Sequence, residues 1–238
     1  MSAWLSAGAL VVGHRGGRGE GWPPENTLAA FEQAWAQGAR AIELDVRTCG
    51  TGEVIVRHDA TRAPLQDLRR EGVPTLAEVL SWAWDRDVAL NVELKHDVPN
   101  RLALIEPTRR ALRRSRGDVL LSSFDPFLLA SAAVALPSVR RALLTSRAQR
   151  RRVPSALVAT PYIHALHLER TQTQPPVLAA LRRRGLRLGV WTVNDPREAS
   201  DLVALGVQTL ITDDPAALLA VDYSGQVTAS TRMPGGGG

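Results

Sequence analysis

Residues 41–60 read AIELDVRTCGTGEVIVRHDA, and the fold prediction starts from this stretch. Apolar and charged residues alternate over 42–47, which is typical of a β-strand whose two faces meet different surroundings. Glu43 and Asp45 therefore project from the same face of that strand. Two carboxylates this close repel each other unless a proton or a cation lies between them. The pattern predicts a site for a divalent cation.

The ligand atoms narrow the choice of cation. Carboxylate oxygens favour magnesium, calcium or manganese over zinc, and the sequence has no cluster of Cys and His that would argue for zinc. The second half of the stretch, 53–57, is rich in β-forming residues and ends in His58-Asp59. An imidazole is thus expected at a strand end near the carboxylates. The alternative interpretation is an exposed edge strand with a solvated acidic face.

The composition limits the architecture. A chain of 238 residues with 45% hydrophobic content can bury one substantial core, so a single domain is expected. The single cysteine, Cys49, permits no internal disulfide, which suits a reducing compartment. The apolar run at 9–13 has no basic residue before it and is too short to span a bilayer. These features predict a soluble, cytoplasmic protein.

The net charge of +5 comes almost entirely from arginine. Arginine clusters at 109–110, 113–114, 150–152 and 182–184 fall in segments with helical patterns, where such clusters are usually solvated. No aromatic residues alternate with them and no nucleic-acid motif is present, which argues against a dedicated nucleic-acid partner. Peripheral contact with a membrane stays open. Lys95 is the only lysine, which indicates that its position needs a compact ammonium.

Strand and helix patterns alternate along the whole chain. Strands are expected at 9–14, 41–47, 89–95, 119–124, 140–145, 187–193 and 209–212, with one more at either 156–160 or 165–168. Helices are expected after the sequence PENT at 24–27, from 74–76 to Trp84, and at 99–114, 126–136, 175–184, 196–205 and 215–221. Repeated βα units with short loops predict a parallel sheet.

About eight such units in this length predict a closed TIM (β/α)8 barrel, because the strands are mostly apolar and no GxGxxG turn follows the first one. The segment between His58 and Pro74 is short, so a compact barrel without a large insertion is expected. The barrel should occupy residues 1–221. Residues 222–238 are small and polar and end in four glycines, which predicts a disordered tail.

The barrel prediction also locates the chemistry. Active residues of such barrels gather at the C-terminal ends of the strands. Several charged residues are expected there: His14, Arg15, Glu43, Asp45, His58, Glu93 and Lys95. A metal, two cationic side chains and two histidines describe a site for an anionic substrate, most simply one that carries phosphate.

An ordered set of motifs resembles the glycerophosphodiester phosphodiesterase family from the first strand to the last. The motifs are GHRG at 13–16, PENT at 24–27, IELDV at 42–46, HD at 58–59, PTL at 74–76, ELK at 93–95, SF at 123–124, WTVN at 191–194 and ITD at 211–213. The resemblance implies a TIM barrel that cleaves glycerophosphodiesters to an alcohol and glycerol 3-phosphate.

Carried over position by position, the resemblance implies three sets of site residues. Glu43, Asp45 and Glu93 would bind the metal, His14 and His58 would be the acid/base pair, and Arg15 and Lys95 would contact the phosphate. Trp191 is expected to line the substrate pocket, with a plain core position as the alternative. The cofactor would be Mg²⁺ or Ca²⁺, with Mn²⁺ as a further candidate.

The expected mechanism is metal-assisted phosphodiester cleavage. The cation, Arg15 and Lys95 would stabilise charge on the phosphate, while one histidine deprotonates the nucleophile and the other protonates the leaving alkoxide. His14 is assigned as the base and His58 as the acid. The nucleophile is either water or the glycerol 2-hydroxyl.

Two other functions remain open at this point. The same site could act on lysophospholipids, as in lysophospholipase D-type relatives, which would need an apolar channel or a membrane-facing patch. A non-catalytic phosphate-binding barrel is less favoured, because a binding module has no need for a matched acid/base pair. The oligomeric state and the preferred headgroup are not predicted.

Overall fold

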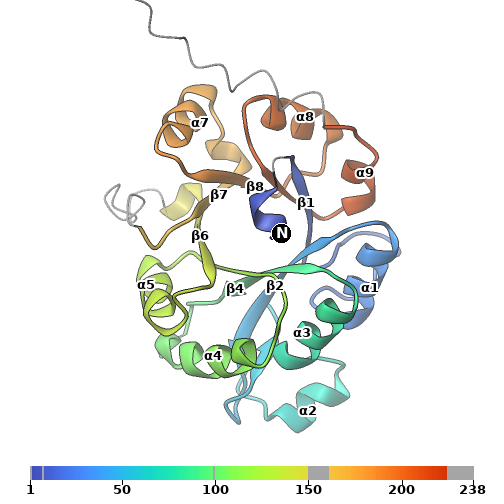
Figure 1. The fold of residues 1–238 in the computed structure, drawn as a ribbon. Helices are drawn as coiled ribbons and strands as arrows, with labels where there is room; N and C mark the ends of the chain where they lie inside the picture. The colour runs from blue at the N-terminus through green and yellow to red at the C-terminus, as the bar shows by residue number, and fades with distance from the viewer. Residues whose placement is uncertain (1, 7, 99, 150–160, 224–238) are drawn as a thin grey trace, which may run out of the picture.

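The computed structural model describes residues 2–6, 8–98, 100–149 and 161–223. In these residues eight parallel strands form a closed ring, in the order β1, β2, β4, β5, β6, β7, β8 and β9, and pairing of β9 with β1 completes it. The helices surround this ring (Figure 1). The strands are β1 Leu10–His14, β2 Ala41–Thr48, β4 Ala89–Leu94, β5 Val119–Ser123, β6 Arg140–Thr145, β7 Ala165–Glu169, β8 Arg187–Trp191 and β9 Thr209–Thr212. The predicted TIM barrel is confirmed.

Local sequence chemistry sets where the outer helices begin. They are α1 Leu28–Ala36, α3 Leu76–Asp85, α4 Ile105–Arg113, α5 Pro126–Ala135, α7 Pro175–Arg182, α8 Pro196–Ala204 and α9 Pro215–Leu219. Thr27 caps α1, and Thr75 with Glu78 forms a reciprocal capping box at α3. Proline opens α5, α7, α8 and α9, because its fixed φ suits the first turn and its missing N–H is not needed there. These starts fall close to the predicted positions.

A short hairpin extends β2 beyond the ring. Strand β3, Val54–Val56, runs antiparallel to β2 with Val56 opposite Val46, and the chain then reaches His58. A helix that the sequence did not predict, α2 at Leu65–Arg70, lies between His58 and α3. It was missed because this six-residue segment buries only one side chain, Leu68, and so shows no helical period.

Side chains inside the ring form a layer of small residues around one large one. Alternate positions of the strands point inward, and at the N-terminal ends of the strands many of these are alanines, including Ala41, Ala89 and Ala165. The space they leave is filled by Trp4, which is buried among them. The N-terminus lies in the middle of the ring (Figure 1), where Asp118 accepts hydrogen bonds from the backbone N–H of Ala3 and, through its own carbonyl, from the Trp4 indole. Trp4 therefore closes the end of the barrel at which the strands begin.

Two details of the expected boundaries are settled by the structure. The helix expected from residue 99 begins as a 3₁₀ turn, Arg101–Leu104, before α4. The undecided strand is β7, so the 165–168 alternative was correct, whereas the other candidate, 156–160, lies outside the described residues. Residues 224–238 of the expected tail lie outside them as well. In the part of the chain that is described, no helix has the length and apolar character needed to cross a membrane.

Two phenylalanines in helices offer a matched test of the outer core. Phe31 on α1 is 0% exposed and packs with Trp82 at a centroid distance of 5.8 Å, whereas Phe127 on α5 is 63% exposed. Phe31→Ala should lower the free energy of unfolding by about 3–5 kcal/mol because it leaves a cavity. Phe127→Ala should change it by about 0.5 kcal/mol or less. Urea unfolding measures both, and equal losses would contradict this packing.

Candidate active site

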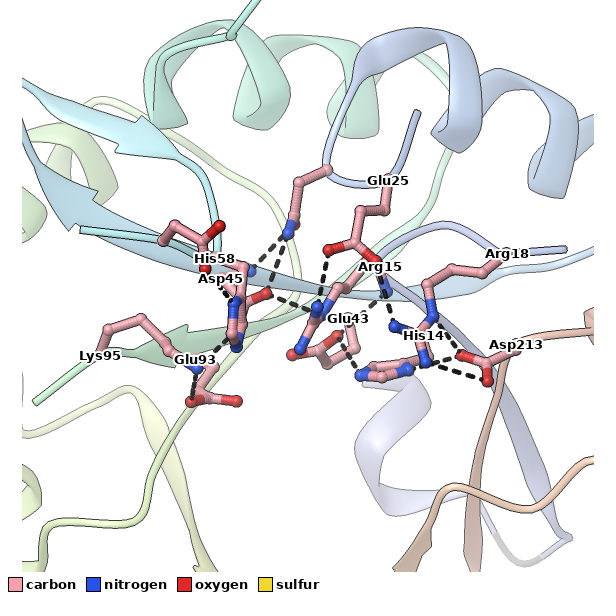
Figure 2. Close-up of polar contacts among 12 residues, drawn as sticks. His14, Arg15, Arg18, Glu25, Glu43, Asp45, His58, Glu93, Lys95 and Asp213 are labelled. Carbon is pink, nitrogen blue, oxygen red and sulfur yellow. Dashed lines mark hydrogen bonds and ion pairs between the residues drawn. The ribbon is translucent and has the colours of Figure 1, made fainter. Parts of the chain in front are cut away.

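Three carboxylates meet at the C-terminal ends of two neighbouring strands. Glu43 and Asp45 are on β2, and Glu93 on β4 pairs in register with Asp45. All three side chains are buried, and one oxygen of each lies within 4.8 Å of the others. Figure 2 shows them converging on one another. Glu43 and Asp45 thus lie on the same face of β2, as predicted, and Glu93 of the neighbouring strand joins them.

Two cations contact this carboxylate cluster from different sides. Lys95 Nζ lies 2.9 Å from Glu93 Oε1 and 3.3 Å from Asp45 Oδ1. Arg15 Nε lies 2.9 Å from Asp45 Oδ2, and the Arg15 backbone N–H donates to Glu43 Oε2 at 3.1 Å. Arg15 also pairs with Glu25, whose other oxygen pairs with Arg18. The loop after β1 is thereby tied to the cluster.

The pKa values of the three carboxyl groups shift in different directions. Burial, and then repulsion from Asp45 and Glu93, raises the pKa of Glu43 well above its usual range. Burial and the charge of Asp45 raise the pKa of Glu93 to about 7. Burial alone would also raise the pKa of Asp45, but Lys95, Arg15 and Asn26 together hold it below its ordinary value. Neighbouring groups therefore compensate the negative charge of Asp45 well, but not the negative charges of Glu43 and Glu93.

This charge balance fits a divalent cation. Three buried carboxylates face two directly contacting cations, and burial together with the repulsion that remains raises the pKa values of Glu43 and Glu93. A cation among the three oxygens would favour their ionised forms. Oxygen-only donors match the preference of magnesium, calcium and manganese. The residues present therefore suit a hard metal ion.

Asn26 holds the central carboxylate in place, a role that the sequence analysis did not assign. Its side-chain N–H donates to Asp45 Oδ2 at 2.9 Å, and its carbonyl accepts from the Asp45 backbone N–H at 3.1 Å. Asn26 has φ of 61°, in the left-handed region that asparagine tolerates better than most residues. The asparagine of the PENT motif thus connects the first loop to β2.

His14 stands at the end of β1 between two carboxylates. Its Nδ1 lies 2.7 Å from Asp213 Oδ1, and its Nε2 lies 3.9 Å from Glu43 Oε2. Asp213 also accepts hydrogen bonds from Arg18 and from Asn194. Burial would raise the pKa of Asp213, but these three donors hold it well below its usual range. Asp213 is therefore ionised, and His14 donates to it through Nδ1.

His58 approaches the carboxylate cluster from another direction. Its side chain is 41% exposed and its Nδ1 lies 2.8 Å from Asp59 Oδ1. Arg47, buried at the end of β2, donates from Nε to the His58 carbonyl at 2.6 Å and pairs with Asp97. In Figure 2, His58 lies by Asp45, whereas His14 lies by Glu43 and Asp213. A protonated His58 would likewise favour the ionised form of Asp45.

Trp191 belongs to an aromatic wall at the end of β8. Its ring meets Phe124 edge-on at a centroid distance of 5.5 Å, and Phe124 in turn lies 6.2 Å from the His96 ring. The indole N–H donates to the His167 carbonyl at 3.2 Å. Trp191 is half-buried.

The structure thus brings six of the eight expected site residues into one contact network, with His58 beside it and Trp191 on the aromatic wall. The six are His14, Arg15, Glu43, Asp45, Glu93 and Lys95. Five further residues orient this network and were given no site role from the sequence: Arg18, Asn26, Arg47, Asn194 and Asp213. Asp213 directly follows β9, so the rule that places functional residues at strand ends points to it as well.

Comparison with known proteins gives a consistent result. The family model described as "Glycerophosphoryl diester phosphodiesterase family" matches residues 14–71 and 60–217. A glycerophosphodiester phosphodiesterase of Caldanaerobacter subterraneus is 28% identical over 88% of this chain and 96% of its own length. An uncharacterised Bacillus subtilis protein is 30% identical over 86% of this chain and 95% of that protein.

Solved structures share the same architecture. An Oleispira antarctica phosphodiesterase in complex with the product sn-glycerol-3-phosphate has a TM-score of 0.79 at 25% identity, covering 92% of this chain and 98% of that one. A glycerophosphoryl diester phosphodiesterase homologue from Silicibacter pomeroyi has a TM-score of 0.79 at 24% identity, covering 92% and 96%. Together with the family match over most of the barrel, these findings show that the chain belongs to the glycerophosphoryl diester phosphodiesterase family.

Proposed function

We propose that this protein hydrolyses glycerophosphodiesters to an alcohol and glycerol 3-phosphate, using a divalent cation held by Glu43, Asp45 and Glu93. The observation that carries the proposal is the buried three-carboxylate cluster with a cationic side chain on two sides. The relative that was solved with sn-glycerol-3-phosphate supports the choice of substrate class.

The carboxylate cluster would bind the metal ion, whereas Arg15 and Lys95 would bind the phosphate. A bound Mg²⁺, Ca²⁺ or Mn²⁺ supplies electrostatic stabilisation of the charge that develops on the phosphoryl oxygens. Arg15 and Lys95 add donors for those oxygens, and their carboxylate partners fix both side chains before substrate arrives. Asn26 and Glu25 hold Asp45 and Arg15 in these positions.

The surroundings of the two histidines suggest different roles. Because Nδ1 of His14 donates to ionised Asp213, Nε2 of the neutral imidazole is a proton acceptor, and it faces the side of Glu43. His14 is therefore assigned as the base that accepts the proton of the nucleophile. His58, more exposed and on the loop after β3, is assigned as the acid that protonates the leaving alkoxide.

A lysophospholipid is the second candidate substrate. Leu102 and Phe127 are both more than half exposed and lie on the segments that follow β4 and β5, whose ends carry Glu93 and Phe124. Apolar side chains near the mouth of the site suit a substrate with an acyl chain. Faster turnover of lysophosphatidylcholine than of glycerophosphocholine would favour this substrate class.

Metal dependence is tested by the release of glycerol 3-phosphate from glycerophosphocholine. EDTA should abolish release, and added Mg²⁺, Ca²⁺ or Mn²⁺ should restore it. Glu93→Gln should lower turnover by about 10²-fold or more, because one oxygen ligand loses its charge. Glu106→Gln is the matched control, since Glu106 is exposed and pairs with Arg109 on the outer helix α4. Full activity in EDTA would contradict the proposal.

The acid/base pair is tested by substitution and chemical rescue. His14→Ala and His58→Ala should each lower kcat by about 10²- to 10⁴-fold. His58 is exposed, so added imidazole should partly restore turnover to His58→Ala but much less to His14→Ala, because the His14 side chain is only 13% exposed. Thermal melting checks that both variants fold. Turnover close to that of the wild type in either variant would remove that histidine from the mechanism.

The pH dependence of stability tests the Asp213 contacts. Asp213→Asn should lower the free energy of unfolding by about 1–3 kcal/mol at about pH 7, because charge-assisted hydrogen bonds are lost. The folded pKa of Asp213 lies below its unfolded value, so the wild-type advantage is complete above about pH 4 and shrinks as the pH falls further. Urea unfolding across this range measures the difference, and one that does not change with pH would contradict the ion-pair account.

A further inference from the structure

A second cavity lies at the opposite end of the barrel from the carboxylates. It has a volume of about 500 Å³ and is bordered by the first residues of β6, β8 and β9, which are Arg140, Arg187 and Thr209. Trp4, which closes this end of the ring, forms part of its wall. A cavity of this size is in the range that holds small molecules.

The charged side chains that line this cavity are all arginines. Arg140, Arg184 and Arg187 line it, and the residues that line it include no Asp or Glu. Arg140 donates to the Ser2 hydroxyl at 3.2 Å and Arg187 to the Ser6 carbonyl at 2.8 Å, both neutral partners. Burial, and then repulsion from Arg140, lowers the pKa of Arg187. Arg140 and Arg187 therefore repel each other, and Asp118 reaches Arg140 through the Ser2 hydroxyl, which donates to it at 2.8 Å.

A buried histidine adds an unpartnered polar group. His167, on β7, lines the cavity, is 1% exposed, and its Nδ1 has no hydrogen-bond partner among the described residues. Burial lowers its pKa to about 4, so the imidazole is neutral near pH 7 and can donate without adding charge. Gly189 on the next strand makes room for the ring, because a Cβ there would lie 2.5 Å from His167 Cδ2.

Apart from His164 and Thr209, the remaining lining is apolar and includes Leu120, Ile163 and Leu186 as well as the Trp4 indole. A free inorganic ion would leave these surfaces uncovered. A molecule that joins an anionic group to an apolar or aromatic body would match both parts of the lining.

We propose that this cavity is a binding site for a small organic anion, such as an organic phosphate or carboxylate, separate from the carboxylate cluster. Arg140 and Arg187, with Arg184 at the exposed rim, bind the anionic group. His167 donates a hydrogen bond from inside the barrel, and Trp4 with its apolar neighbours covers the body of the ligand.

The test uses the full-length protein with the fluorescent probe 1-anilinonaphthalene-8-sulfonate, which is an aromatic anion. Phenyl phosphate should displace the bound probe at concentrations at least about tenfold lower than inorganic phosphate does. Arg187→Gln should weaken binding of the probe by about tenfold, the loss expected for one charge-assisted hydrogen bond. Arg184→Gln should weaken it in the same direction, and because Arg184 is exposed, this variant tests the site without disturbing the core.

Arg110→Gln is the matched control. Arg110 is also an exposed arginine, and it lines a different groove of about 730 Å³ between α3 and α4, beside Trp84. This variant should bind the probe like the wild type. An unchanged affinity in both Arg184→Gln and Arg187→Gln, or an equal loss in Arg110→Gln, would overturn the assignment. Displacement by inorganic phosphate as effective as that by phenyl phosphate would overturn the organic part of it.

Discussion

Burying three carboxylates beside one another is the constraint on which the rest of this site depends. Desolvation and mutual repulsion oppose the ionisation of Glu43 and Glu93, so the surrounding chain must supply positive charge and donors. Arg15 comes from the loop after β1 and Lys95 from the end of β4, and Asn26 adds two hydrogen bonds to Asp45. The left-handed backbone at Arg15 and Asn26 occurs where these donors must reach β2.

The two ends of the barrel carry different clusters of charged side chains. Three carboxylates with Arg15 and Lys95 lie where the strands end, whereas Arg140 and Arg187 lie where β6 and β8 begin. His167 and Trp191 lie between, on adjacent strands, joined by a hydrogen bond from the indole to the His167 carbonyl. A parallel barrel makes this arrangement natural, because every strand contributes its first residue to one face and its last to the other.

Local patterns predicted the parts of the structure that depend on local rules. Alternation placed Glu43 and Asp45 on one face, and the repeated βα units predicted the barrel. The residues that were missed act over long sequence separations. Asp213 meets His14 across the closure of the ring, and Arg18 in the first loop donates to the same carboxylate. Neither pairing leaves a periodic signal, because each depends on how distant segments come together.

The unique lysine has a consequence for how this protein can be handled chemically. Its ammonium is largely buried against Asp45 and Glu93, which hold its pKa above the usual value despite burial. All other basic side chains except the histidines are guanidinium groups. Acylating and imine-forming reagents therefore find a single side-chain amine in the whole chain, and it lies in the carboxylate cluster, protonated and shielded. A stable amide or imine formed at an internal side chain of this protein therefore reports on the opening of that site.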